Sequence, residues 1–145
     1  MNADRIAIVA AARLWIGTKY QHQASLRQVG CDCLGLLRGV WRDIVGPEPE
    51  AIPLYSTAWM SITAEELLLT GLERHFQRVA TDAFLAGDVL VFRFGRHWPA
   101  SHIGIAASPT SMIHAHCGAC VAEVDIGDHW RRRLAAVLSF PGLNN

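Results

Sequence analysis

Residues 30–36 read Gly-Cys-Asp-Cys-Leu-Gly-Leu, a polar turn that runs directly into an apolar helical stripe. The spacing predicts a helix from Cys33 to about Val45, which Gly46-Pro47 ends. Cys33 then lies in the first helical turn, where free backbone N–H groups and the helix dipole favour a thiolate. Gly35 leaves room for a close approach of backbone. This stretch alone leaves two interpretations of Cys33 open, an activated nucleophile and a small buried hydrophobic residue.

Along the chain, predicted helices come first and predicted strands second. Helical spacing predicts one helix from about Ala3 to Ile16, with Asn2 as its N-cap. It predicts another from Thr63 to about Phe76, which begins with a capping box of Thr63 and Glu66. Apolar runs between turn residues predict five strands, at Asp88–Phe94, Ser101–Ala106, Ser111–His116, Val121–Asp125 and Leu134–Phe140. This order is typical of an α+β domain with N-terminal helices packed on an antiparallel sheet, and we expect one domain over residues 1–145.

Two of the predicted strands carry His102 and His114, and the turn-forming residues 107–109 separate them. If the hairpin is centred on Ser108, the two histidines face each other directly, with Cβ atoms ~5 Å apart. Both imidazoles then lie on one face of the hairpin and isoleucines lie on the other. A histidine base held by a second polar group is the arrangement of a catalytic triad. We therefore predict Cys33 as the nucleophile, His102 as the base and His114 as the orienting residue.

The composition excludes several classes of protein. Half of the residues are apolar (51%), and 13 basic residues balance 13 acidic ones, so nothing predicts a nucleic-acid or anionic-membrane partner. No apolar run approaches the ~18 residues of a membrane span. Residues 1–17 lack the features of a secretion signal, so we expect synthesis in the cytoplasm and delivery by another route. The run at residues 131–133 is interpreted as a solvated basic face.

Four motifs in order resemble those of the NlpC-type cysteine peptidases that cut bacterial cell walls. They are WIGTKY at 15–20, DCLGL at 32–36, HIGI at 102–105 and IHA at 113–115. The sequence of residues 20–25, 30–35 and 38–42 is most similar to the branch found in phage tails and gene-transfer particles. The resemblance implies a papain-like core without a cofactor. It also implies cleavage of the amide between γ-D-glutamate and a diamino acid in peptidoglycan stem peptides.

The resemblance also implies roles for individual residues. Cys33, His102 and His114 match the nucleophile, the base and the third, orienting residue of the family. Tyr20 matches a tyrosine whose hydroxyl helps to stabilise the oxyanion, beside a backbone N–H at the helix start. Asp32 matches an aspartate that in many members receives the free amino terminus of the substrate.

One residue departs from the family pattern. Many members have Ser where this chain has Leu34, and that serine helps to hold the substrate amine. The departure leaves substrate recognition open but not the acyl-transfer chemistry. The missing signal peptide and wall-binding domain fit delivery by a phage-like tail, with tail proteins as partners and the periplasm or cell wall as the place of action.

Two alternatives remain open from the sequence. The first is a zinc site built from His114, His116, Cys117 and Cys120, although structural zinc sites usually take ligand pairs from separated segments and these four lie within seven residues. We therefore expect no metal. The second is a tail component that kept the fold and lost the chemistry. His116 is otherwise interpreted as a rim residue, and Trp130 as a core or sheet-covering residue.

Overall fold

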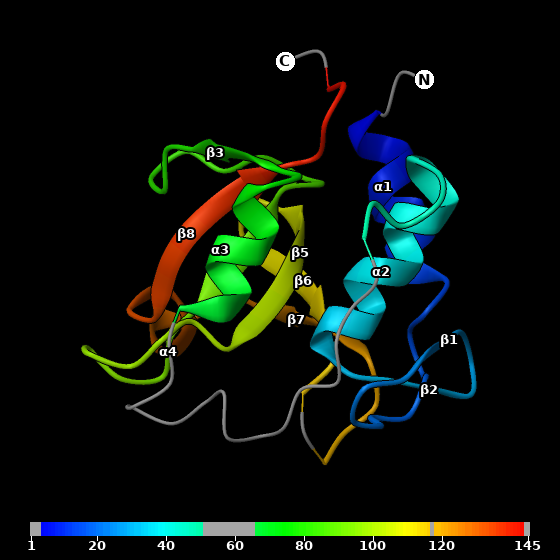
Figure 1. The fold of residues 1–145 in the computed structure, drawn as a ribbon. Helices are drawn as coiled ribbons and strands as arrows, with labels where there is room; N and C mark the ends of the chain where they lie inside the picture. Colours follow the sequence, from blue (N-terminus) through cyan, green and yellow to red (C-terminus); the bar gives the residue numbers. More distant parts are fainter. Residues whose placement is uncertain (1–3, 51–65, 117, 144–145) are drawn as a thin grey trace.

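The computed structural model describes residues 4–50, 66–116 and 118–143, and the architecture of these residues is mixed α and β. In chain order the elements are α1 Arg5–Arg13, β1 Ser25–Leu26, β2 Gly30–Cys31, α2 Cys33–Ile44, α3 Leu67–Glu73, β3 Gln77–Val79, β4 Val89–Phe92, β5 His102–Ser108, β6 Ser111–His114, β7 Ala122–Asp125, α4 Asp128–Arg131 and β8 Leu134–Ser139. Figure 1 shows α1 and α2 together beside the large sheet. The predicted α+β class, with N-terminal helices on an antiparallel sheet, is confirmed.

The large sheet has the strand order β3-β8-β4-β5-β6-β7, and every neighbouring pair is antiparallel. Strand β5 pairs with β4 on one side and β6 on the other, and α2 packs against it. Strands β1 and β2 form a separate two-stranded ribbon directly before α2. The sheet therefore brings β5 next to the helix that begins at Cys33.

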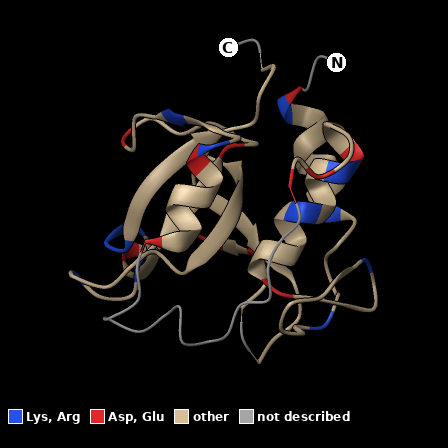
Figure 2. Ribbon diagram, viewed as in Figure 1, with Lys and Arg blue, Asp and Glu red and all other residues tan. Residues whose placement is uncertain are grey.

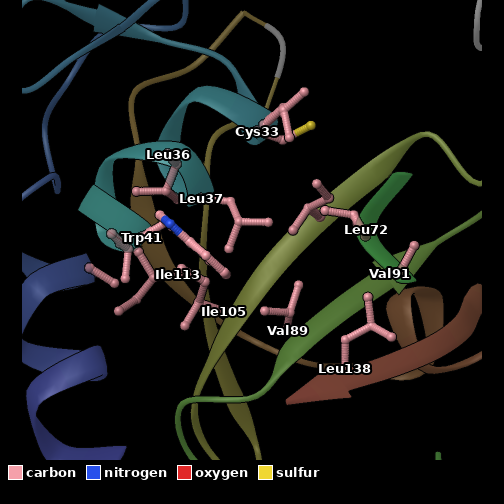
Figure 3. Close-up of a cluster of buried hydrophobic side chains, with 14 of the residues drawn as sticks. Cys33, Leu36, Leu37, Trp41, Leu72, Val89, Val91, Ile105, Ile113 and Leu138 are labelled. Carbon is pink, nitrogen blue, oxygen red and sulfur yellow. The ribbon is translucent and has the colours of Figure 1, made fainter. Parts of the chain in front are cut away.

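Alternating side chains of the strands build two hydrophobic clusters, one on each face of the sheet. The cluster between helices and sheet includes Leu36, Leu37, Trp41, Val89, Ile105 and Leu138, which Figure 3 shows facing one another. The cluster on the opposite face consists of Leu90, Phe92, Ala106, Met112, Ile126 and Val137. A sheet covered on both faces gives a rigid base for side chains at its edge and ends.

The helices differ from the predictions mainly at their ends. The N-cap of α1 is Asp4, whose carboxylate accepts the backbone N–H of Ala7 at 2.6 Å, so the prediction of Asn2 was wrong. Helix α1 ends at Arg13 and not near Ile16, because the chain turns at residues 14–17. Aspartate satisfies the first free N–H groups as well as asparagine does, and sequence preference does not decide between them.

Helix α3 and four short elements show the limits of periodicity. Helix α3 ends at Glu73, three residues before the predicted end. The predicted capping residue Thr63 lies outside the described residues. Strands β1, β2 and β3 and helix α4 were not predicted, because two to four residues are too few to display a hydrophobic period.

The register of the β5–β6 hairpin corrects a second prediction. Gly104, and not His102, lies opposite His114, and Ala106 lies opposite Met112. The turn is shorter than predicted, since Ser108 pairs with Ser111, and the register shifts between Ala106 and Ser108. The predicted pairing is thus displaced by two residues. A displacement of two keeps every side chain on its face, so both histidines still lie on the same face.

The ends of the described chain and the start of α2 lie far apart. Figure 1 shows both chain ends toward the same end of the molecule, and the beginning of α2 toward the other end. Within the described residues, no helix combines the length and the apolar character that crossing a membrane requires.

Candidate active site

Asp32 fixes the start of α2. It is the N-cap of the helix, and its Oδ1 accepts the backbone N–H of Gly35 at 2.7 Å. Its Oδ2 accepts the backbone N–H of Gln23 at 2.7 Å, which attaches the preceding turn to the helix. A Cβ atom on Gly35 would collide with the carbonyl oxygen of Ala24, so the predicted close backbone approach at this glycine is confirmed. Cys33 is consequently held at the first residue of α2, as predicted.

The Cys33 thiol is neutral in this environment. The pKa of Cys33 is raised to about 12, mainly by burial and to a smaller extent by the carboxylate of Asp32, while backbone N–H groups, foremost that of Ile103, lower it by less. The sequence predicted that the helix start would favour a thiolate, whereas desolvation outweighs the helix start in the structure. The N–H of Ile103 directed at the sulfur also shows where α2 meets β5, one residue after His102.

The two predicted histidines lie in contact. The Nε2 atom of His102 is 2.8 Å from Nδ1 of His114, and the rings lie at 77° to each other. Both side chains are buried, with 4% and 6% of their surface exposed. The prediction that the two imidazoles meet is confirmed, although they meet on a diagonal of the hairpin.

This hydrogen bond fixes which ring nitrogens could act. It occupies Nε2 of His102, which leaves Nδ1 as the atom to accept a proton. If Nδ1 of His102 is the base, then Nε2 carries the hydrogen and donates it to Nδ1 of His114. His114 must then carry its own hydrogen on Nε2. In the described part of the chain the Cys33 thiol and the His102 ring share no hydrogen bond, and the Ile103 backbone links the two.

Aromatic and imidazole rings surround His102. Trp130 of α4 stacks on it, with ring centroids 5.1 Å apart and an angle of 27° between planes. Phe94 lies 6.0 Å from the same ring, and His116 lies 5.4 Å from it. Trp130 was interpreted as a core or sheet-covering residue, and its place beside the base was missed because the short helix that carries it has no sequence signature. His116 is exposed, as expected of a rim residue, and its ring also lies close to those of both His102 and His114.

The surroundings keep both buried histidines neutral near pH 7. Burial lowers the pKa of His102 well below 6.5, and the neighbouring His114 and His116 lower it further. Burial also lowers the pKa of His114 to about 4, with a smaller contribution from His116. A neutral imidazole can accept a proton, so the state needed for a general base is the resting state.

Tyr20 lies close to the start of α2 through its backbone. Its N–H donates to the carbonyl of Ala119 at 3.2 Å, and the residue forms a bridge with Cys31, two residues before the nucleophile. Its side chain is half-buried against the main cluster. Its role in stabilising an oxyanion stays a prediction, as does amine binding by Asp32, whose two oxygens each accept a backbone N–H.

The residues of the zinc alternative are only partly described. His114 and His116 have ring centroids 5.7 Å apart, Cys120 is an exposed free thiol, and Cys117 lies outside the described residues. Among the side chains that the structure does describe, no group of three or more His, Cys, Asp and Glu residues is arranged to hold a metal ion.

An antiparallel sheet with a cysteine at a helix start beside a strand histidine is the architecture of the papain-like class, and known proteins share it. Residues 17–139 match the NlpC/P60 family. The chain therefore belongs to the NlpC/P60 family of cysteine peptidases, which are typically peptidoglycan hydrolases. Among curated protein sequences, none matches the chain.

Solved structures share the fold at low sequence identity. The NlpC/p60 domain of the peptidoglycan hydrolase SagA is 22% identical, with a TM-score of 0.66, and the match covers 94% of this chain and 98% of that one. NlpC2 from Trichomonas vaginalis is 19% identical, with a TM-score of 0.68 and coverage of 95% and 46%. An NlpC/P60 family protein from Bacillus cereus is 16% identical, with a TM-score of 0.69 and coverage of 94% and 40%. The chain thus spans less than half of the last two proteins.

Proposed function

We propose that the chain is a cysteine peptidase that hydrolyses an amide in peptidoglycan stem peptides, of the γ-D-glutamyl-diamino acid type. The observation that supports this most directly is the buried contact of 2.8 Å between the rings of His102 and His114. The next residue after His102, Ile103, directs its backbone N–H at the Cys33 sulfur. Membership of the NlpC/P60 family supports the substrate class.

In the proposed mechanism, Cys33 and His102 start neutral. Nδ1 of His102 takes the thiol proton as the sulfur attacks the amide carbonyl carbon. The resulting oxyanion is stabilised by backbone N–H groups at the start of α2 and by the hydroxyl of Tyr20, each worth roughly 3 kcal/mol. His102 then gives its proton to the departing amine, which leaves an acyl-enzyme. Water activated by the same imidazole hydrolyses the thioester and releases the acid.

His114 and Trp130 serve the charged intermediate in this mechanism. When His102 becomes an imidazolium, the neutral His114 accepts its Nε2–H and keeps the ring oriented. The stacked indole of Trp130 presents its electron-rich face to the same ring, which favours a cation there. The hydrogen bond to His114 and the stacking of Trp130 therefore stabilise the imidazolium more than they stabilise the neutral ring.

We further propose that a phage-like tail carries the protein to its substrate, so that it acts in the periplasm or the cell wall. The similarity of residues 20–25, 30–35 and 38–42 to the tail branch supports this. A tail component without activity would share the fold and the carrier, and it would differ only in the chemistry at Cys33.

Digestion of purified sacculi tests the proposed activity. We expect the protein to release fragments with new amino termini on the diamino acid, detected by analysis of the soluble muropeptides. Cys33→Ala should stay folded and lose at least roughly 10³-fold in rate, because the members of such a set act as a unit. Cys120→Ala, which removes an exposed thiol, is the matched control and should keep the rate. A wild-type protein that creates no new amino termini, or a fully active Cys33→Ala, would contradict the proposal.

A further inference from the structure

A basic cleft of about 380 Å³ is lined in part by Phe94, whose ring neighbours that of His102. We define it by the residues that line it, namely Arg93, Phe94, Gly95, Arg96, Arg132, Arg133 and Leu134. The loop after β4 forms one wall, and the passage from α4 to β8 forms the other. The N–H of Arg93 donates to the carbonyl of Arg133 at 2.9 Å and holds the walls together. Figure 2 shows basic segments in both walls, and the lining contains four arginines and no acidic residue.

Most of the positive charge in the basic cleft is not neutralised. Arg93 forms an ion pair with Glu66 at 3.0 Å, while Arg133 donates to the uncharged carbonyl of His129 at 2.7 Å. Arg96 and Arg132 are exposed, and within the described residues neither makes an ion pair or a side-chain hydrogen bond. Like charges gathered in one cleft repel each other, and a bound anion removes that repulsion. The basic cleft is therefore a ready site for an anion.

The basic cleft adjoins the base of the proposed mechanism through one residue. Phe94 lines the cleft, and its ring lies 6.0 Å from the ring of His102 and 5.9 Å from that of Trp130. A ligand group in the cleft could consequently contact the same aromatic ring that neighbours the His102 imidazole. This places the cleft within reach of another part of a substrate molecule bound at His102.

We propose that the basic cleft binds a carboxylate of the stem peptide next to the amide that is cut. This inference rests on the proposed function. A γ-linked glutamate uses its side-chain carboxyl in the amide, so its α-carboxylate stays free and lies a few bonds from the scissile carbonyl. The diamino acid carries the other nearby carboxylate. A guanidinium pairs with a carboxylate through two parallel hydrogen bonds, and Arg96 and Arg132 have their donors available for this within the described structure.

Binding to the Cys33→Ala protein tests the inference without turnover. The probe is the tripeptide L-Ala-γ-D-Glu-diaminopimelate, measured by calorimetry in three forms: unmodified, amidated at the glutamate α-carboxyl, and amidated at a diaminopimelate carboxyl. We expect Arg96→Gln with Arg132→Gln to weaken binding of the unmodified peptide about tenfold. In the protein with both arginines, amidation at one of the two positions should weaken binding by the same factor of about ten. In the arginine variant, the same amidation should have no effect on binding. The position that behaves so identifies the carboxylate.

Arg78→Gln is the control for a change of the same kind outside the cleft, because it removes one positive charge from an exposed ion pair on β3. It should leave binding unchanged. In the active protein, the two arginine changes should raise KM by the same factor and leave kcat unchanged. The inference is overturned if the Cys33→Ala protein does not bind the peptide, or if the arginine changes weaken every form equally or none. If binding depends on the arginines but the protein cuts no peptide, the proposed chemistry is refuted and the inference about the basic cleft stands. If the protein cuts the peptide at a rate that does not depend on the arginines, the inference is refuted and the proposed chemistry stands.

Discussion

Burial keeps both reacting side chains of the candidate site neutral. It raises the pKa of Cys33 to about 12 and lowers the pKa of His102 well below 6.5. A preformed thiolate–imidazolium pair would place two charges where water is excluded, and the desolvation of both opposes it. The residues are therefore suited to transfer the proton during attack on the substrate, when the developing oxyanion is stabilised at the same time.

The pH dependence of kcat/KM follows from these two shifts. His102 acts as a base only when unprotonated, and a lowered pKa keeps it unprotonated down to a more acidic pH. We expect kcat/KM to stay level from pH 9 down to 6.5 and to fall only below the ordinary histidine pKa of about 6.5. A pH–rate profile on a soluble stem peptide measures this. An acid limb with its midpoint at or above pH 6.5 would contradict the neutral resting pair.

At the scale of single residues, the sequence predicted where the site residues lie better than it predicted their protonation states and ring contacts. The apolar stripe after Asp32 placed Cys33 at a helix start, because this depends on a few neighbouring residues. The pKa values and the stacking of Trp130 on His102 depend on which distant segments bury the site, and local spacing carries no information on that.

At the scale of elements, the β5–β6 hairpin shows which features of a strand pair local pattern determines. Alternation predicted both strands and the shared face of the two histidines, because apolar residues have to face the helices. The register was wrong by two residues, because it depends on the turn between Ser108 and Ser111 and on the bulge before it. The contact between His102 and His114 was still correctly predicted, because a shift of two residues does not change the face.

The start of α2 should be intolerant of any side chain at Gly35. Gly35→Ala would drive a Cβ into the carbonyl of Ala24, which is backbone and cannot move aside alone. We expect a loss of at least about 2 kcal/mol in the free energy of unfolding, measured by urea denaturation, together with loss of activity as Cys33 shifts. The clash is the reason for the loss, since alanine otherwise favours a helix.

Gly71→Ala in α3 is the matched control for this prediction. A Cβ there would meet only Arg74, at 3.6 Å, which is an ordinary contact. Alanine should therefore stabilise the protein by roughly 0.5–1 kcal/mol, as expected inside a helix. Equal effects of the two substitutions would show that helix propensity, and not the approach of Ala24, decides the outcome at Gly35.

At the scale of the whole molecule, long-range contacts join the N-terminal helices to the sheet. Arg5 of α1 forms an ion pair with the buried Asp88 at 2.7 Å, directly before β4. Strand β8, near the C-terminus, inserts between β3 and β4. Sequence predicted the α+β class but not this strand order, because the pairing of distant strands is decided by the assembled core and leaves no local pattern.

The stability of the folded protein should decrease in mild acid. The pKa of His114 is lowered to about 4 and that of His102 is also lowered, so between about pH 6.5 and 4 the unfolded chain binds protons that the folded protein does not. Their contribution is complete above pH 6.5, and each histidine removes up to about 1.4 kcal/mol per pH unit as the pH falls below it. Urea denaturation between pH 7.5 and 5 measures this slope.

This pH window separates the histidines from the carboxylates. The pKa of Glu48 is lowered from 4.5 by Arg38 and Arg42, against an opposing effect of burial, so its contribution is lost only at lower pH. His114→Gln should flatten the slope between pH 6.5 and 5, whereas His97→Gln, at an exposed position, should leave it unchanged. Identical slopes in both variants would show that another group governs acid stability.

The position of the chain ends has a practical consequence for handling the protein. Both ends of the described chain lie away from the start of α2. An affinity tag or a surface linker attached at either end would therefore leave the Cys33 side turned outward. Protein immobilised on beads in this way could be presented to an insoluble polymer without the support covering the sulfur.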